Sequence, residues 1–233
     1  MKNLFFITIV SLFTLQSSAQ NLDQFFNSSD VFFKTYVKNG LVDYSSINKN
    51  DLNTILENAS KITVIKSDVK NFQAFWINAY NLTVIKSLLD NMPIKSPLDK
   101  AGFFDKKTYH LAGKQITLND IEHKLLRANF KDARFHFVLV CGALGCPPLI
   151  SKAYLPSTLD TQLTVQTKKA INGSFLQVKA TKIQASEIMK WYKEDFTMNG
   201  KTEIDFINKY RTEKVPEKAK ISYFPYNWTI NKQ

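Results

Sequence analysis

Cysteine and histidine, the residues that most often bind metal ions, are scarce in this sequence. It contains 2 cysteines and 3 histidines, and Cys141 and Cys146 have four residues between them. A structural zinc site needs closely spaced cysteine pairs together with further cysteine or histidine ligands. The histidines, His110, His123 and His136, lie upstream of the cysteines on different predicted elements. We therefore predict no metal site, and the sequence indicates no cofactor.

Arginine is also scarce. The net charge is +11, yet only three of the 31 basic residues are arginines and the lysines are scattered singly. Proteins that read DNA bases directly rely strongly on the two-pronged guanidinium group of arginine. The charge therefore predicts a solvated, lysine-rich surface, and no sequence-specific nucleic acid as a partner.

Long hydrophobic runs are absent, apart from residues 4–13. That run of about ten residues is too short for a membrane-spanning helix, which needs roughly 20. It follows Lys2 and precedes the small residues Ser17, Ser18 and Ala19, which is the pattern of a secretory signal peptide. We predict cleavage between Ala19 and Gln20, and a secreted or periplasmic mature chain that is soluble and has no membrane span.

Aromatic residues are abundant, at 13% of the sequence and with 18 phenylalanines, which excludes a disordered chain. We predict one compact α+β domain over residues 20–233, with helices dominating its first part and strands its second. Apolar spacing and capping residues predict seven helices, over residues 22–38, 51–59, 68–89, 118–129, 158–171, 186–196 and 202–210. Extended segments are predicted over residues 42–44, 107–111, 115–117, 134–141, 175–178, 182–184 and 221–230.

Cys141 lies where the predicted strand 134–141 gives way to a glycine-containing loop. Loops of this kind often carry catalytic or binding residues. Three states of Cys141 stay open: a reactive thiol, an inert buried thiol, and a disulfide with Cys146, which an oxidising compartment favours.

A cysteine nucleophile needs a general base within about 3 Å. On a regular strand, His136 and Cys141 would point to opposite faces and lie roughly 16 Å apart. His123, in the helix 118–129, is therefore the better candidate base, with Glu122 or Asn78 as an orienting group. The backbone amides of Gly142 and Ala143 would stabilise the oxyanion.

The helix 68–89 carries Asn78 and Asn81 three residues apart, so both amides share one face. Buried amides must be hydrogen-bonded, so they either hold a neighbouring loop or face a polar pocket. This suggests a second hypothesis, a non-catalytic binding module. Its pocket would comprise Trp76, Asn78, Asn81, His136, Gly142 and Cys146 together with Cys141.

Five stretches taken together resemble the domain-of-unknown-function family 547. They are FWINAYNL at 75–82, DIEHKLLR at 120–127, FHFVLVCGALGCPPL at 135–149, EIMKWYKEDF at 187–196 and FPYNWTIN at 224–231. The family has no firmly assigned activity. The resemblance implies small secreted proteins in bacteria, and an importance of Cys141 that does not depend on Cys146.

The helix that contains Asn78 also resembles the core helix of papain-like and transglutaminase-like folds. In those folds a nucleophilic cysteine begins the helix, and this sequence has none there. We expect a module that binds an unknown small molecule, peptide or protein. The alternative is a thiol-dependent hydrolase or acyl-transferase on peptide or amide bonds that uses Cys141 and His123.

Overall fold

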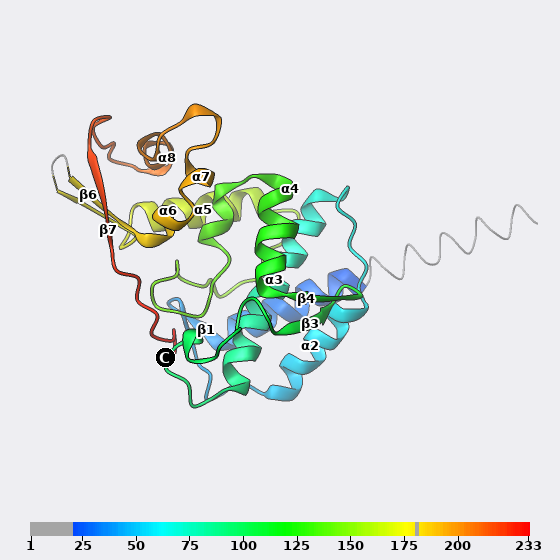
Figure 1. Ribbon diagram of the computed structural model, residues 1–233. Helices are drawn as coiled ribbons and strands as arrows, with labels where there is room; N and C mark the ends of the chain where they lie inside the picture. The colour runs from blue at the N-terminus through cyan, green and yellow to red at the C-terminus, as the bar shows by residue number, and fades with distance from the viewer. Residues whose placement is uncertain (1–20, 180–181) are drawn as a thin grey trace, which may run out of the picture.

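The computed structural model describes residues 21–179 and 182–233, which form a mixed α+β fold with many helices and three small sheets (Figure 1). Buried hydrophobic side chains gather in two clusters. The larger lies in the N-terminal part around one long helix, and the smaller lies in the C-terminal part. Phe135 belongs to the first cluster and Phe137 to the second, so the segment that carries them joins the two.

The central helix of the first cluster is α3, Val69–Asp90, as its apolar residues predicted. Sixteen of its 22 residues are buried, because hydrophobic side chains surround its whole circumference. Residues 21–36 form another helix, and α2 (Lys49–Lys61) packs against α3 and β3. The strands of this part are β1 (Val37–Lys38), β2 (Leu41–Val42), β3 (Thr108–Leu111) and β4 (Lys114–Thr117), and the last two confirm the predicted hairpin.

The second cluster lies between helices and a three-stranded sheet of order β5-β6-β7. Strand β5 pairs antiparallel with β6, and β6 pairs parallel with β7. A parallel pair needs a long connection, and helices supply it here. In chain order the elements are α5 (Leu159–Ile171), β5 (Leu176–Lys179), β6 (Lys182–Ser186), α6 (Glu187–Trp191), α7 (Lys193–Phe196), η4 (Met198–Gly200), α8 (Glu203–Tyr210) and β7 (Lys220–Phe224).

The predicted helix starts are confirmed by capping hydrogen bonds. Thr117 Oγ1 accepts from the Asp120 amide at 3.0 Å, and the Ser186 side chain accepts from the Ile188 amide. Thr202 and Asp205 form a reciprocal capping box at the start of α8. Each cap satisfies an amide that has no partner inside its own helix.

Two predictions are wrong. The predicted strand 134–141 is instead η3, a short 3₁₀ helix over Ala133–Phe137, followed by residues 138–141 without regular structure. A strand needs a neighbouring strand, and here the Asn81 side chain takes that place: its amide donates to the Val138 carbonyl and accepts from the Val140 amide, both at 2.9 Å. The predicted helix 186–196 is divided at Tyr192 into α6 and α7.

The segment after Thr117 begins with a wide helical turn. Residues Asp120–Arg127 form η2, a π-helix, and Ala128–Phe130 continue it as α4. A π-helix rotates its side chains relative to an α-helix, and such stretches are frequent at functional sites. The other short helix of this half is η1, Pro97–Asp99, which Ser96 caps.

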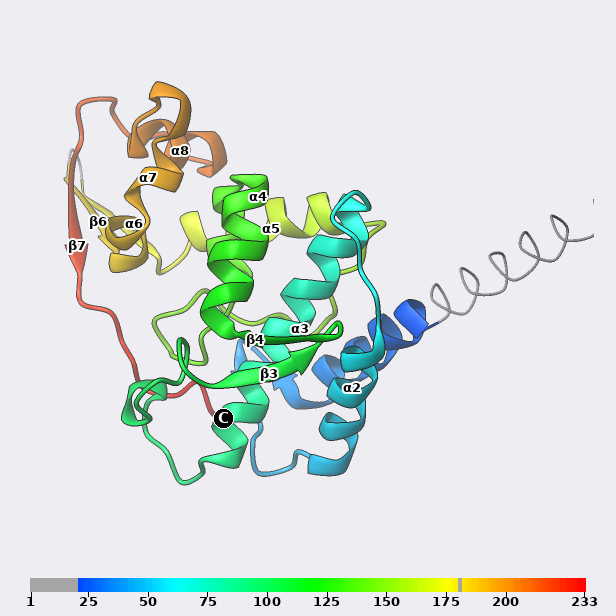
Figure 2. The same cartoon turned by 45° about the vertical axis from the view of Figure 1, so that its right-hand side comes forward.

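After β7 the chain returns along the molecule to the N-terminal half (Figure 2). The Leu144 and Gly145 amides donate to the carbonyls of Thr229 and Asn227 at 2.7 and 2.8 Å. The Val42 amide donates to the Asn231 carbonyl at 2.8 Å. The tail of residues 225–231 thereby connects the second cluster to the cysteine loop and to β2.

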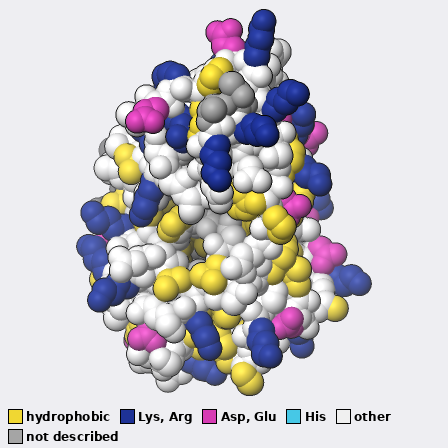
Figure 3. Space-filling model, turned by 90° about the vertical axis from the view of Figure 1, so that its left-hand side faces the viewer, with side chains coloured by type: hydrophobic (Ala, Val, Ile, Leu, Met, Phe, Trp, Pro, Cys, Tyr) yellow, Lys and Arg dark blue, Asp and Glu magenta, His cyan; other side chains and the backbone are white. Residues whose placement is uncertain are grey.

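Lysine and arginine side chains are dispersed around the face seen in Figure 3, with hydrophobic side chains between them. Over residues 21–179 and 182–233, no helix is long and apolar enough to cross a membrane. The predicted signal peptide and its cleavage site lie outside the described residues.

Candidate functional site

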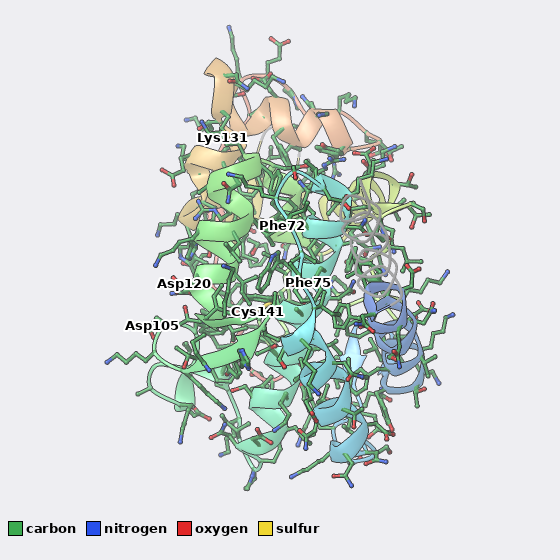
Figure 4. The ribbon with its side chains drawn as sticks, turned by 90° about the vertical axis from the view of Figure 1, so that its right-hand side faces the viewer. Phe72, Phe75, Asp105, Asp120, Lys131 and Cys141 are labelled. Carbon is green, nitrogen blue, oxygen red and sulfur yellow. A yellow bond between two sulfur atoms is a disulfide. The ribbon has the colours of Figure 1, made fainter. Side chains whose placement is uncertain are left out.

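The site begins with η2, which points different side chains to opposite sides. Asp120 lies on the outer side, where its carboxylate pairs with Lys124 at 2.8 Å (Figure 4). Glu122 points inward and is buried. Arg127, at the end of η2, also reaches inward, and its Nε donates to Asp195 Oδ2 at 2.6 Å. The π-helix thus places the Glu122 carboxylate and the Arg127 guanidinium on its inward side.

His136 lies on η3 and faces Glu122 and Asp195. It is 4% exposed, because its neighbours in the chain, Phe135 and Phe137, are each buried in one of the two hydrophobic clusters. His136 Nε2 lies 2.6 Å from Asp195 Oδ2, and Nδ1 lies 3.9 Å from Glu122 Oε1. A carboxylate only accepts hydrogen bonds, so Nε2 carries the proton and donates to Asp195.

Asp195 is consequently held as a carboxylate. Its burial opposes ionisation, but hydrogen bonds and charge from His136 and Arg127 outweigh burial and lower its pKa to about 2. Tyr192 adds a second fixed contact, since its ring stacks on His136 with centroids 4.0 Å apart. The Arg127 guanidinium lies 4.6 Å from the same ring's centroid. The orientation of His136 is therefore set from two directions.

The two cysteines are joined by a disulfide, one of the three states that the sequence left open. Tyr226, in the C-terminal tail, contacts both sulfurs: its hydroxyl donates to Cys146 Sγ at 2.8 Å and lies 3.0 Å from Cys141 Sγ. Gly145 permits this approach, because a Cβ there would lie 2.8 Å from the Tyr226 ring. Figure 4 places Cys141 between η2 and α3, inside the molecule.

Glu122, His136, Tyr192, Tyr226 and the two cysteines line one cavity of about 120 Å³, whereas Arg127 and Asp195 lie behind its lining. Its walls come from η2, η3, α3, α6, the cysteine loop and the tail. The lining residues are Tyr80, Phe104, Asn119, Glu122, His136, Leu139, Cys141, Cys146, Ile188, Trp191, Tyr192, Tyr226 and Trp228. Six of them are aromatic, and Trp191, Tyr226 and Trp228 contact one another with ring centroids 4.7 to 5.9 Å apart.

Glu122 makes the interior of this cavity negative. Burial raises the pKa of the Tyr80, Tyr192 and Tyr226 hydroxyls, and the charge of Glu122 raises each of them further. The three phenols therefore stay protonated, and they present neutral hydrogen-bonding groups and aromatic rings around one carboxylate.

The structure brings four of the sequence-predicted site residues together at this cavity, namely Glu122, His136, Cys141 and Cys146. His123 lies outside the lining, where its Nδ1 is 2.7 Å from Arg127 Nη1. The reason for preferring it over His136 was the strand geometry of residues 134–141, and that geometry is wrong. Of the two histidines, His136 is the one that shares a cavity with Cys141.

The other predicted pocket residues lie in the core. Trp76 is fully buried between aromatic neighbours. Asn78 donates to the carbonyls of Ala74 and Tyr154 and accepts from the Tyr154 amide, so it holds a loop, as Asn81 does. Gly142 has φ +84° and is buried, and a Cβ there would lie 2.3 Å from Leu88 Cδ1.

Sequence reasoning missed Asp195 and the aromatic side chains of the second half, Trp191, Tyr192, Tyr226 and Trp228. They lie 50 residues or more beyond His136 in the chain, so no local spacing connects them to the cysteine loop. The available signal was their concentration in two short segments, KWYKED and FPYNW. Within residues 21–179 and 182–233, no group of three histidine, cysteine or acidic side chains is arranged to hold a metal ion.

Acid unfolding should depend on Asp195. Its folded-state pKa of about 2 lies below the ordinary aspartate pKa of 3.8, so the ionised carboxylate stabilises the fold above pH 4 and loses that contribution as the pH falls toward 2. Asp195→Asn should therefore lower the free energy of unfolding at pH 7, and the difference from the parent should shrink between pH 4 and 2. Urea unfolding over a pH series measures this. Glu194→Gln, at an exposed neighbour, should follow the parent, and an Asp195→Asn curve parallel to the parent's would contradict the assignment.

Comparison with known proteins gives one match. Residues 66–171 match the family described as "Protein of unknown function, DUF547". The match contains the first three of the five motifs and ends before α6 and the tail. No curated protein and no solved structure matches the chain, so the papain-like expectation stays a prediction.

Proposed function

Because the chain carries a DUF547 domain over residues 66–171, whose description assigns no activity, we propose a function from the cavity: a module that binds a compact cationic group of a small molecule or peptide. The observation that carries this proposal is a buried carboxylate, Glu122, inside a cavity with aromatic walls. Aromatic faces attract organic cations, and the attraction increases when water is excluded.

The charge balance around the cavity supports a cation over an anion. Arg127 pairs with Asp195 at 2.6 Å and with Glu194 at 3.3 Å, and its charge also acts on Glu122. Three carboxylates, those of Glu122, Glu194 and Asp195, therefore share one guanidinium and the His136 imidazole, so negative charge exceeds positive charge. Burying a carboxylate costs free energy unless an opposite charge compensates for it. A bound cation would supply that charge.

The size of the cavity limits the ligand. The cavity volume is about 120 Å³, whereas pockets for drug-sized molecules have roughly 300 Å³ or more. The enclosed part of the ligand is therefore a head group, with the remainder of the molecule extending past Trp191, which is 45% exposed.

Choline and its uncharged carbon isostere, 3,3-dimethylbutan-1-ol, test the proposal. Choline should bind to the full chain, and the isostere should bind at least tenfold more weakly, because a desolvated cation–aromatic contact contributes about 2 kcal/mol. Isothermal titration calorimetry and tryptophan fluorescence measure the two affinities. Glu122→Gln should remove the preference for choline.

The matched control is Asp120→Asn, which neutralises a carboxylate on the outer side of the same helix. It should bind choline as the parent does. Equal affinity for choline and the isostere would refute cation recognition. An unchanged preference in Glu122→Gln would show that a different site binds the cation.

The alternative is a thiol-dependent hydrolase or acyl-transferase on peptide or amide bonds. It is supported by the shared cavity of Cys141 and His136, and by Asp195 orienting that histidine, an arrangement that suits an activated nucleophile. It requires a free Cys141 thiol, whereas the sulfur is bonded to Cys146. Binding requires no thiol, so the geometry supports the binding module better.

We further propose that the protein works in the periplasm or outside the cell. The lysine, apolar run and small residues of positions 1–19 support export, as the sequence predicted. The Cys141–Cys146 disulfide is consistent with it, since disulfides persist mainly in oxidising compartments.

A further inference from the structure

We infer that the Cys141–Cys146 disulfide is redox-active and exchanges with a small thiol that enters the cavity, with Cys146 as the sulfur that leaves. Both cysteines are half-buried and line the cavity, so a small molecule there can reach the bond. Cys146 packs against the larger hydrophobic cluster, and a tyrosine hydroxyl and a backbone amide contact the disulfide as well.

The hydrogen bonds around the two sulfurs are unequal. Cys146 Sγ accepts from the Cys141 amide at 3.0 Å and from the Tyr226 hydroxyl at 2.8 Å. Cys141 Sγ lies 3.0 Å from the same hydroxyl, but a hydroxyl has one proton to donate. When that proton points to Cys146, this sulfur has two donors. Hydrogen bonds to the charged form of a group favour that form.

A sulfur with two donors is the better leaving group in thiol–disulfide exchange, because a leaving thiol with a lower pKa departs faster. The thiolate of a small thiol attacks Cys141 Sγ, a new sulfur–sulfur bond forms there, and the Cys141–Cys146 bond breaks with its electron pair on Cys146. A second thiolate then attacks the small-molecule sulfur of the mixed disulfide and releases Cys141 as a thiolate. The protein gains two electrons, and two small thiols are oxidised to one disulfide.

The cavity also suggests which small thiol. If the proposed cation binding holds, Glu122 favours a thiol that carries an ammonium group and disfavours one that carries a carboxylate. The substrate class is then a small aminothiol or its disulfide. This refinement depends on the proposed function, whereas exchange at the disulfide does not.

The test follows reduction of the full-length, oxidised protein by cysteamine, 2-mercaptoethanol and 3-mercaptopropionate, with each rate divided by the reagent's thiolate concentration. Tyr226→Phe keeps the ring and removes the donor, so it should slow reduction by all three reagents about tenfold, the factor that one hydrogen bond to a charged group provides. Tyr223→Phe, on β7, removes a hydroxyl that donates to Glu203 on α8, and it should react like the parent.

The site of attack is read by quenching with excess N-ethylmaleimide, which alkylates free protein thiols and the remaining reagent together, followed by peptide mass spectrometry. The cysteamine adduct should be on Cys141, and the alkyl group on Cys146. An adduct mainly on Cys146 would overturn the assignment of the leaving sulfur. The inference as a whole would be overturned if Tyr226→Phe were reduced at the same rate as the parent. It would also be overturned if both cysteines were alkylated without any reductant.

The relative reduction rates with the three reagents separate this inference from the proposed function. A faster reaction with cysteamine than with 3-mercaptopropionate, which Glu122→Gln abolishes, supports both. If Tyr226→Phe slows reduction but the three reagents react with the parent at equal rates, the result supports exchange and refutes the aminothiol preference. Choline binding with no Tyr226 effect leaves the binding module standing and refutes exchange. The melting temperature and the near-UV circular dichroism of the oxidised Tyr226→Phe variant should match those of the parent, which shows that the fold is intact.

Discussion

Trp76→Ala should lower the free energy of unfolding by about 3–5 kcal/mol, the usual cost of truncating a buried aromatic side chain. Trp76 is fully buried in the middle of α3, and its ring contacts Phe72 and Phe75. The residues around it belong to the larger hydrophobic cluster, so the space cannot be refilled by a simple shift. For a chain of this size, we expect a melting temperature lower by roughly 6–20 °C.

Two variants separate the loss of packing from the loss of a tryptophan as such. Trp191→Ala removes a tryptophan that is 45% exposed, so it should melt close to the parent. Trp76→Phe should cost clearly less than Trp76→Ala, because it keeps most of the ring. It also removes a buried Nε1 group that has no hydrogen-bond partner within the described part of the chain. Equal melting of Trp76→Ala and the parent would mean that α3 is not the core.

Asn81→Leu should destabilise the fold by about 2–6 kcal/mol. Leucine is similar in size, but it leaves the Val138 carbonyl and the Val140 amide buried without their partner, at about 1–3 kcal/mol each. Both valines are at most 3% exposed, so water cannot replace the lost bonds. Urea unfolding measures the loss.

The matched control for this variant is Asn71→Leu, on the first turn of the same helix. Its amide bonds to the Asp68 carboxylate near the surface, where water can substitute, so its effect should stay within about 0.5 kcal/mol. Asn81→Leu should also change the cavity, since Val140 precedes Cys141. In Asn81→Leu the Cys141–Cys146 disulfide should be reduced at a different rate from the parent's, even at urea concentrations at which the variant is still folded. A loss of stability equal in both variants would argue against a special role for Asn81.

The elements that local chemistry determines could be predicted from the sequence. Helix α3 follows from its apolar circumference, the β3–β4 hairpin from the Gly113 turn, and the starts of α6 and α8 from Ser186 and Thr202. In each case the residues that decide the structure lie within a few positions of it. The coarse α+β class follows in the same way.

Residues 134–141 were mispredicted because their hydrogen-bond partners lie elsewhere. A run such as FHFVLV favours a strand, but strand pairing requires a second strand, and the fold provides the side chain of Asn81 instead. The error then affected the site, because it assigned His136 to the wrong face. Glu122, Cys141 and Cys146 were found from local context, whereas Asp195 and Tyr226 are brought in only by tertiary structure.

The tail that carries Tyr226 has a consequence for biosynthesis. A ribosome makes the chain from its N-terminus, so Cys141 and Cys146 are synthesised before residues 225–231. Until then, nothing from the tail covers the sulfurs, and an oxidant can reach them without passing the aromatic walls. Once the Thr229 and Asn227 carbonyls accept from the loop amides, Tyr226 covers the bond. Residues 225–231 therefore complete the cavity, and a nascent chain that still lacks them presents two accessible cysteines in its place.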